Sequence, residues 1–157
     1  MRIRPGDVTA APERALLDDY FAFRAAAFPS DGSPYTVTYP DPAAFAGGNG
    51  VFLVIEDDGG ALVGAGGIRM LATDDPATVR FEVKHVWLAP ETRGRGWATD
   101  LMNDLEARAR AFGATELVLD THDTLTAAAR LYARLGYEPT APYNTNPNAT
   151  RWYRKPL

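Results

Sequence analysis

The sequence predicts a single α/β domain whose central sheet is mixed but mostly antiparallel. Its 157 residues are the length of one domain, and no linker, repeat or low-complexity segment divides residues 1–157. Three β-rich runs between residues 51 and 88 predict an antiparallel meander, and the helix and strand patterns that alternate beyond it predict two crossover units. Counted along the chain, these patterns give about six to seven strands and about four helices.

The N-terminal part is expected to form a short strand and a helix. Residues 2–4 favour a strand, which the following Pro-Gly pair ends. Apolar residues recur at helical spacing between Pro12 and Phe28, which predicts an amphipathic helix. Residues 29–50 are rich in Pro, Gly, Ser and Asp, and predict a long loop with one helical turn at Pro42–Ala46. Loops of this length in a compact domain often cover a binding site.

The rest of the chain contains the meander and the alternating elements. The meander strands cover Val51–Glu56, Ala61–Leu71 and Thr78–Leu88. Asp57-Asp58-Gly59-Gly60 between the first two is a strong hairpin turn. The later elements are a helix at Thr99–Phe112, a strand at Glu116–Asp120, a helix at Leu125–Leu135, a strand from Tyr137 and a closing strand at Trp152–Arg154. Gly113 and Gly136 mark the ends of the two helices.

Composition excludes several classes of function. The formal net charge is −4 and the pI is about 5.1, which argues against binding nucleic acid through phosphate neutralisation. Cysteine is absent, so disulfides and thiolate metal sites are excluded, and the two histidines lack metal-site spacing. No apolar run reaches membrane-spanning length, and the N-terminus lacks a signal-peptide apolar region. We therefore expect a cytoplasmic protein without metal, nucleic acid or membrane partners.

Residues 82–98 are the most informative stretch. A β-rich run ends at Ala89-Pro90, a loop turns at Gly94 and Gly96, and an amphipathic helix follows. Such a junction places free backbone N–H groups at a helix N-terminus, where they can bind phosphate. The Lys-Ser/Thr pair of a nucleoside-triphosphate loop is missing, and the glycine spacing does not fit a dinucleotide-binding turn. A structural turn with solvated arginines is the alternative.

Two segments resemble one enzyme family. The loop reads Arg93-x-x-Gly96-x-Ala98, which resembles the acyl-CoA-binding motif of the GCN5-related N-acetyltransferases, the GNAT family. Residues 127–137, Ala-Ala-Ala-Arg-Leu-Tyr-Ala-Arg-Leu-Gly-Tyr, are similar to the family signature Ala-x-x-x-Leu-Tyr-x-x-x-Gly-Phe/Tyr. The resemblance spans residues 50–155. It implies one N-acetyltransferase domain over residues 1–157 that uses acetyl-CoA as acyl donor.

The resemblance also implies a set of cofactor-binding residues. In the family a strand separates from its neighbour, pantetheine lies along the exposed edge, and the pyrophosphate binds the loop amides. Pantetheine would face Val86, Trp87 and Leu88. The pyrophosphate would be held by Arg93, Gly94, Arg95, Gly96, Trp97 and Ala98. Many members have an asparagine seven residues before the helix tyrosine; Leu125 stands there, so Thr124 or Thr126 would have to replace it.

For catalysis, the resemblance implies Tyr132 as the acid that protonates the leaving thiolate and Glu82 as the base that deprotonates the amine. The alternative for Tyr132 is an aromatic side chain that only packs on the sheet, and for Glu82 an ion pair with Lys84 or an arginine. Strand alternation places Glu82, Lys84, Val86 and Leu88 on one side, and Val83, His85 and Trp87 on the other. His85 is thus a second candidate base, on the opposite side from Glu82.

The expected activity is acyl-CoA-dependent N-acyl transfer to a small-molecule amine. Because there is no cysteine, no cysteinyl-enzyme can form and direct transfer is favoured. The tail from Pro142 resembles a prokaryotic branch of the family, which would place the loop Tyr143–Pro147 beside the acceptor. A protein or peptide acceptor and a non-catalytic acyl-CoA-binding module are the alternatives. The meander edge could also pair across a homodimer.

Overall fold

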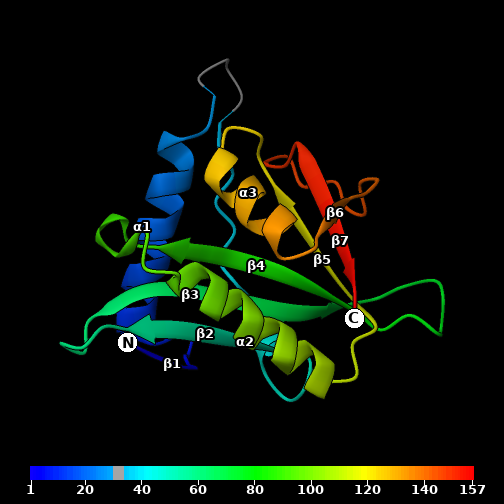
Figure 1. Cartoon of the computed structure of the whole chain (residues 1–157), viewed down its shortest axis with the longest axis horizontal. Helices are drawn as coiled ribbons and strands as arrows, with labels where there is room; N and C mark the ends of the chain where they lie inside the picture. The colour runs from blue at the N-terminus through cyan, green and yellow to red at the C-terminus, as the bar shows by residue number, and fades with distance from the viewer. Residues whose placement is uncertain (30–33) are drawn as a thin grey trace.

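The computed structural model describes residues 1–29 and 34–157, which build one seven-stranded sheet with helices on both faces (Figure 1). The strands are β1 (Arg2–Pro5), β2 (Gly50–Glu56), β3 (Leu62–Leu71), β4 (Arg80–Leu88), β5 (Glu116–Thr121), β6 (Glu138–Pro139) and β7 (Arg151–Pro156). The helices are α1 (Ala11–Ala26), α2 (Trp97–Ala111) and α3 (Thr126–Arg134), with 3₁₀ turns η1 (Pro42–Phe45) and η2 (Pro90–Thr92). The prediction of one α/β domain is confirmed.

The strand order is β1-β2-β3-β4-β5-β7-β6. Only β4 and β5, which α2 connects, run parallel; the other neighbours are antiparallel. The predicted meander is therefore confirmed. The second predicted crossover does not form a parallel pair, because the chain after α3 returns through the two-residue β6 and inserts β7 antiparallel to β5.

The described residues contain three α-helices rather than about four. The expected fourth helix falls in the Pro- and Gly-rich segment before β2, which forms only the single turn η1. Asp41 caps this turn by accepting a hydrogen bond from the backbone N–H of Ala43. No helix in residues 1–29 and 34–157 is long and apolar enough to cross a membrane.

Two hydrophobic clusters lie on opposite faces of the sheet. Leu17 and Phe21 of α1 pack with Phe52 and Val54 of β2 on one face. On the other face, one cluster contains Leu53 and Ile55 of β2 together with Leu101 and Leu105 of α2 and Leu131 of α3. In Figure 1, α2 and α3 lie in front of the sheet and α1 lies behind it. The continuous apolar run of β2 is explained by burial of both its faces.

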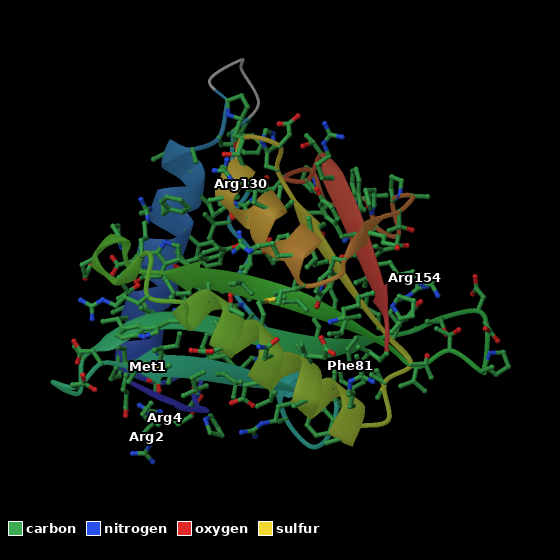
Figure 2. All side chains as sticks on the ribbon, viewed as in Figure 1. Met1, Arg2, Arg4, Phe81, Arg130 and Arg154 are labelled. Atoms are coloured by element: carbon green, nitrogen blue, oxygen red, sulfur yellow. The ribbon has the colours of Figure 1, made fainter. Side chains whose placement is uncertain are left out.

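Glu116 connects three neighbouring strands at the end of the sheet where β4 and β5 pair. Its carboxylate, 3% exposed, accepts hydrogen bonds from Arg80 of β4 and Arg154 of β7. In Figure 2, Arg154 lies on β7, far from Arg2 and Arg4 at the β1 edge. Burial acts to raise the pKa of Glu116, but hydrogen bonds and charge from the two arginines outweigh it, so the pKa lies below its usual value.

We expect Glu116→Gln to be destabilised in a pH-dependent way. Because the folded-state pKa is lowered, the ionised carboxylate stabilises the fold above its unfolded-state pKa, and this contribution is lost as the pH falls through the folded-state pKa. The variant should lose about 1.5–3 kcal/mol of unfolding free energy at neutral pH, and the difference from the wild type should shrink below about pH 4. Urea unfolding at several pH values measures this. An equal loss at every pH would contradict it, and the exposed Glu138→Gln serves as control.

Candidate functional site

The sheet opens between β4 and β5. Only Arg80–Glu82 of β4 are in register with Glu116–Val118 of β5, although β4 continues to Leu88 and β5 to Thr121. Beyond Glu82, the β5-facing edge of β4 therefore has no strand partner in the described structure. An open edge of this kind can bind an extended ligand as an additional strand.

A β-bulge shapes β4 at this opening. Gly67 of β3 lies opposite Lys84 and Ala65 lies opposite Trp87, so His85 and Val86 together face Gly66. His85 has a φ of 57°, in the left-handed region that non-glycine residues rarely adopt. Such a bulge bends the strand and changes its side-chain directions.

The bulge overturns the regular alternation expected for β4. His85 packs against Tyr20 and Phe21, on the α1 face that also carries Glu82 and Lys84. Val86 and Leu88 instead pack with the cluster on the α2 face. The expectation that His85 faces away from Glu82 is wrong, because one extra residue inverts the facing of the residues beyond it.

The glycine loop leads from β4 into α2. Gly94 has a φ of 77° and Gly96, the residue before the first turn of α2, a φ of 81°. No side chain caps this helix, and no backbone acceptor within the described ranges pairs with the N–H groups of residues 94–98. These donors and the positive end of the helix dipole make a binding site for an anion.

The opening, the loop and α1 enclose a cleft of about 1110 Å³. The predicted cofactor residues that line it are Val86, Trp87, Leu88, Arg93, Gly94, Gly96, Trp97, Ala98, Thr124 and Thr126. Arg95 is not among the lining residues; its guanidinium lies 5.1 Å from the centre of the Trp97 ring. Thr124 Oγ1 lies 2.9 Å from Nδ1 of His122, which leaves Thr126 as the less constrained of the two threonines.

Tyr132 of α3 also lines the cleft. The side chain is 7% exposed, and its ring packs against those of Tyr137 and Tyr153. Burial raises the pKa of Tyr132 to about 12, against the opposite effect of the positive charge of Arg24. The phenol is therefore protonated at neutral pH and is able to donate a proton.

Glu82 lies behind the cleft wall and is fully buried. Oε2 accepts a hydrogen bond from Arg69 Nε at 2.8 Å and forms an ion pair with Nη2 of the same side chain at 2.7 Å. Oε1 accepts from the Tyr143 hydroxyl at 2.9 Å and from Asn144 Nδ2 at 3.3 Å, and Lys84 Nζ is also 3.3 Å away. An unpaired carboxylate at this depth would cost several kcal/mol, so these partners are what permits its burial.

Asp120 is the carboxylate that lines the cleft itself. Lys84 Nζ lies 3.3 Å from Oδ2, and Asn144 and Asn146 donate amide hydrogen bonds to it at 2.6 and 3.1 Å. Asp120 is not among the site residues predicted from the sequence, although the Leu-Asp-Thr triplet at 119–121 could have indicated it. The loop from Tyr143 to Pro147, expected beside the acceptor, contributes Asn144, Thr145 and Asn146 to the lining.

His85 lines the same cleft as a neutral imidazole. Burial lowers its pKa to about 3, and the charges of Lys84 and Arg69 act in the same direction. Its Nδ1 is buried without a hydrogen-bond partner in the described part of the chain. Within that part, no three histidine, aspartate or glutamate side chains form a group that could hold a metal ion.

Comparison with known protein families establishes which family this is. The model of the acetyltransferase (GNAT) family matches residues 14–137. The chain belongs to the GNAT acetyltransferase family. This is the family that the two sequence signatures implied.

Individual GNAT relatives agree with this. An uncharacterized N-acetyltransferase of Schizosaccharomyces pombe is 38% identical over 66 residues, which make up 42% of this chain and 40% of the relative. A structure from Klebsiella pneumoniae, described as an acyl-CoA N-acyltransferase, has a TM-score of 0.75 and 29% identity, covering 99% of this chain and 97% of its own. A phosphinothricin acetyltransferase from Sinorhizobium meliloti in complex with acetyl-CoA shares the fold, with a TM-score of 0.72, 20% identity and coverage of 99% and 88%.

Proposed function

We propose that this GNAT acetyltransferase transfers an acetyl group from acetyl-CoA directly to the amine of a small molecule. The observation that carries the proposal is that one cleft combines the unpartnered loop N–H groups, the open edge of β4 and the protonated Tyr132. The N–H groups form an anion site, the β4 edge can bind an extended chain, and Tyr132 can donate a proton. Acyl transfer from a CoA thioester requires all three.

Acetyl-CoA would bind along the open edge. Pantetheine would extend beside Val86–Leu88, and the pyrophosphate would bind the N–H groups of residues 94–98, with the side chain of Arg93 beside them. Arg95 would take part through its backbone, because its side chain stacks on Trp97. A backbone N–H near Leu88 would polarise the thioester carbonyl.

We expect Gly96→Ala to weaken acetyl-CoA binding more than Gly60→Ala does. Both glycines have a positive φ, 81° and 83°, and an added Cβ would meet no atom within 4 Å at either. Each variant should therefore lose about 1–2 kcal/mol of stability from backbone strain alone. Only Gly96 lies in the loop, so calorimetry should show an acetyl-CoA Kd raised about tenfold for Gly96→Ala and unchanged for Gly60→Ala. No binding of acetyl-CoA to the wild type would refute the proposed function.

In the reaction, the amine nitrogen attacks the thioester carbon, the C–N bond forms and the C–S bond breaks. Tyr132 would donate its phenolic proton to the leaving thiolate. The leaving thiolate, whose thiol has a pKa of about 8.5, is less basic than a phenolate, so the phenolate left behind would regain a proton through solvent. The proton that the nitrogen releases as the amide forms balances this step. The lack of cysteine fits this direct route.

We expect Tyr132→Phe to lower kcat on the order of 10²-fold or more, with the Kd for acetyl-CoA nearly unchanged, because the substitution removes only the phenolic proton. Tyr137→Phe is the matched control. The Tyr137 hydroxyl is also buried, has no partner in the described residues, and belongs to a ring 5.9 Å from that of Tyr132. Thiol release measures both rates. Wild-type kcat in Tyr132→Phe would remove this residue from the mechanism.

For the base, the geometry favours Asp120 over Glu82. Asp120 lines the cleft, whereas Glu82 is enclosed by Arg69, Lys84, Tyr143 and Asn144. Asp120 would accept a hydrogen bond from the acceptor ammonium and take its proton. Glu82 would act behind it, by holding Lys84 and Asn144 in place.

We expect Asp120→Asn to lower kcat on the order of 10²-fold, and Glu82→Gln to lower it less than about tenfold while reducing stability. The reason is that only the first substitution removes a carboxylate in contact with the cleft. Thiol release over a range of pH, together with urea unfolding, separates the two effects. A larger kcat loss in Glu82→Gln would restore Glu82 as the base.

A small acceptor is favoured over a protein because the acceptor half of the cleft is bridged. Asn148 Oδ1 accepts from the backbone N–H of Thr36 at 3.0 Å, and its Nδ2 donates to the Thr36 carbonyl at 2.7 Å. This pair of hydrogen bonds joins the segment before η1 to the loop before β7. A peptide would have to displace it, whereas a small amine would not.

A further inference from the structure

The ionised side chains around Glu82 form a balanced set. Arg69 and Lys84 supply two positive charges, and Glu82 and Asp120 supply two negative charges. Every member has a partner of opposite sign within the set. These four groups therefore leave no net charge for an acceptor to neutralise.

Arg24 of α1 is different. It lines the cleft, and within residues 1–29 and 34–157 no carboxylate lies within ion-pair distance of it. One nitrogen, Nη1, donates to the Tyr20 hydroxyl at 3.3 Å, and the guanidinium carbon lies 5.5 Å from the centre of the Tyr35 ring. Most of its N–H donors are thus left for a ligand.

The guanidinium lies near the reacting groups. Its positive charge lowers the pKa of both Tyr132 and His85, and the negative charge of Asp120 raises the pKa of both. Its neighbours Tyr20 and Tyr35 bring no negative charge of their own, and neither does His85, whose pKa its charge lowers. Within the described residues, Arg24 is therefore a positive charge without a carboxylate partner, and it lines the same cleft as the proposed base.

Two other arginines in the cleft also lack a carboxylate partner within the described residues. Arg93 stands on the glycine loop and Arg134 on the last turn of α3. Both suit the phosphates of the cofactor. Arg24 lies instead with Lys84, His85 and Asp120, on the acceptor side.

We propose that Arg24 binds a carboxylate of the acceptor, so that the acceptor is a small amino acid with an apolar side chain. The ammonium would contact Asp120, the carboxylate would contact Arg24, and the apolar part would pack on Tyr20 and Tyr35. A monoanionic group is favoured because, among the described residues other than the two arginines assigned to the cofactor, Arg24 adds one positive charge to the balanced set. This inference rests on the proposed acetyl transfer.

The test uses calorimetry with the CoA-saturated protein and two probes of the same shape, 3-phenylpropionate and the neutral 3-phenylpropanamide. We expect the carboxylate to bind about tenfold or more tightly than the amide, as for a charge-assisted hydrogen bond at a partly exposed site. A third probe, 2-phenylethylphosphonate, carries a phosphonate in place of the carboxylate. Tighter binding of the phosphonate would overturn the assignment to a carboxylate.

The variants Arg24→Met and Arg24→Gln should both lose the preference for 3-phenylpropionate over the amide. Arg14→Met is the matched control. Arg14 is also on α1 and its guanidinium lies 3.6 Å from the centre of the Tyr39 ring, but it is exposed and does not line the cleft. Absence of a preference in the wild type, no binding of the carboxylate, or a preference that survives in both Arg24 variants would overturn the proposal.

The two proposals fail in different ways. The protein could prefer the carboxylate probe through Arg24 and yet release no thiol from acetyl-CoA with any amine. That result would contradict the transfer reaction and support the anion site. Thiol release with a probe preference that does not depend on Arg24 would support the transfer reaction and refute the anion site.

Discussion

The site depends on the early end of the pairing between β4 and β5. Parallel neighbours normally satisfy each other's backbone groups along their whole length, but here registration stops at Glu82 and Val118. Glu116 and its two arginines hold the strands together at the paired end, and the bulge at His85 redirects β4 where they separate. Because backbone donors and acceptors need partners, the gap is suited to a ligand with an amide backbone of its own.

The ionised side chains beside that gap are already paired with groups of opposite charge. Glu82 could not be buried without Arg69 and Lys84, and Lys84 in turn fixes Asp120 at the cleft surface. The network also includes the tail loop, because Tyr143 and Asn144 donate to Glu82. Segments that are far apart in sequence are thus held by one set of hydrogen bonds, and the positions of the reactive groups follow from it.

The two ends of the cleft differ in the type of positive charge they present. At the loop, the N–H groups at the start of α2 and the side chain of Arg93 suit a strongly anionic, extended group. At the other end, aromatic rings and a neutral His85 surround Arg24. In the proposed function, a cofactor rich in phosphate and a smaller acceptor would therefore have separate places, with Tyr132 lining the same cleft.

The fold class, the meander, the glycine loop and the family could be predicted from the residues alone, because these depend on local periodicity, turn residues and contiguous motifs. Tertiary structure alone decided the facing of His85, since a bulge is a property of how β4 pairs with β3 and leaves no pattern in β4 itself. It alone decided that Glu82 is enclosed while Asp120 lines the cleft, because both are acidic residues on β strands. It also singled out Arg24, whose lack of a carboxylate partner in the described chain appears only once every charge around the cleft has been placed.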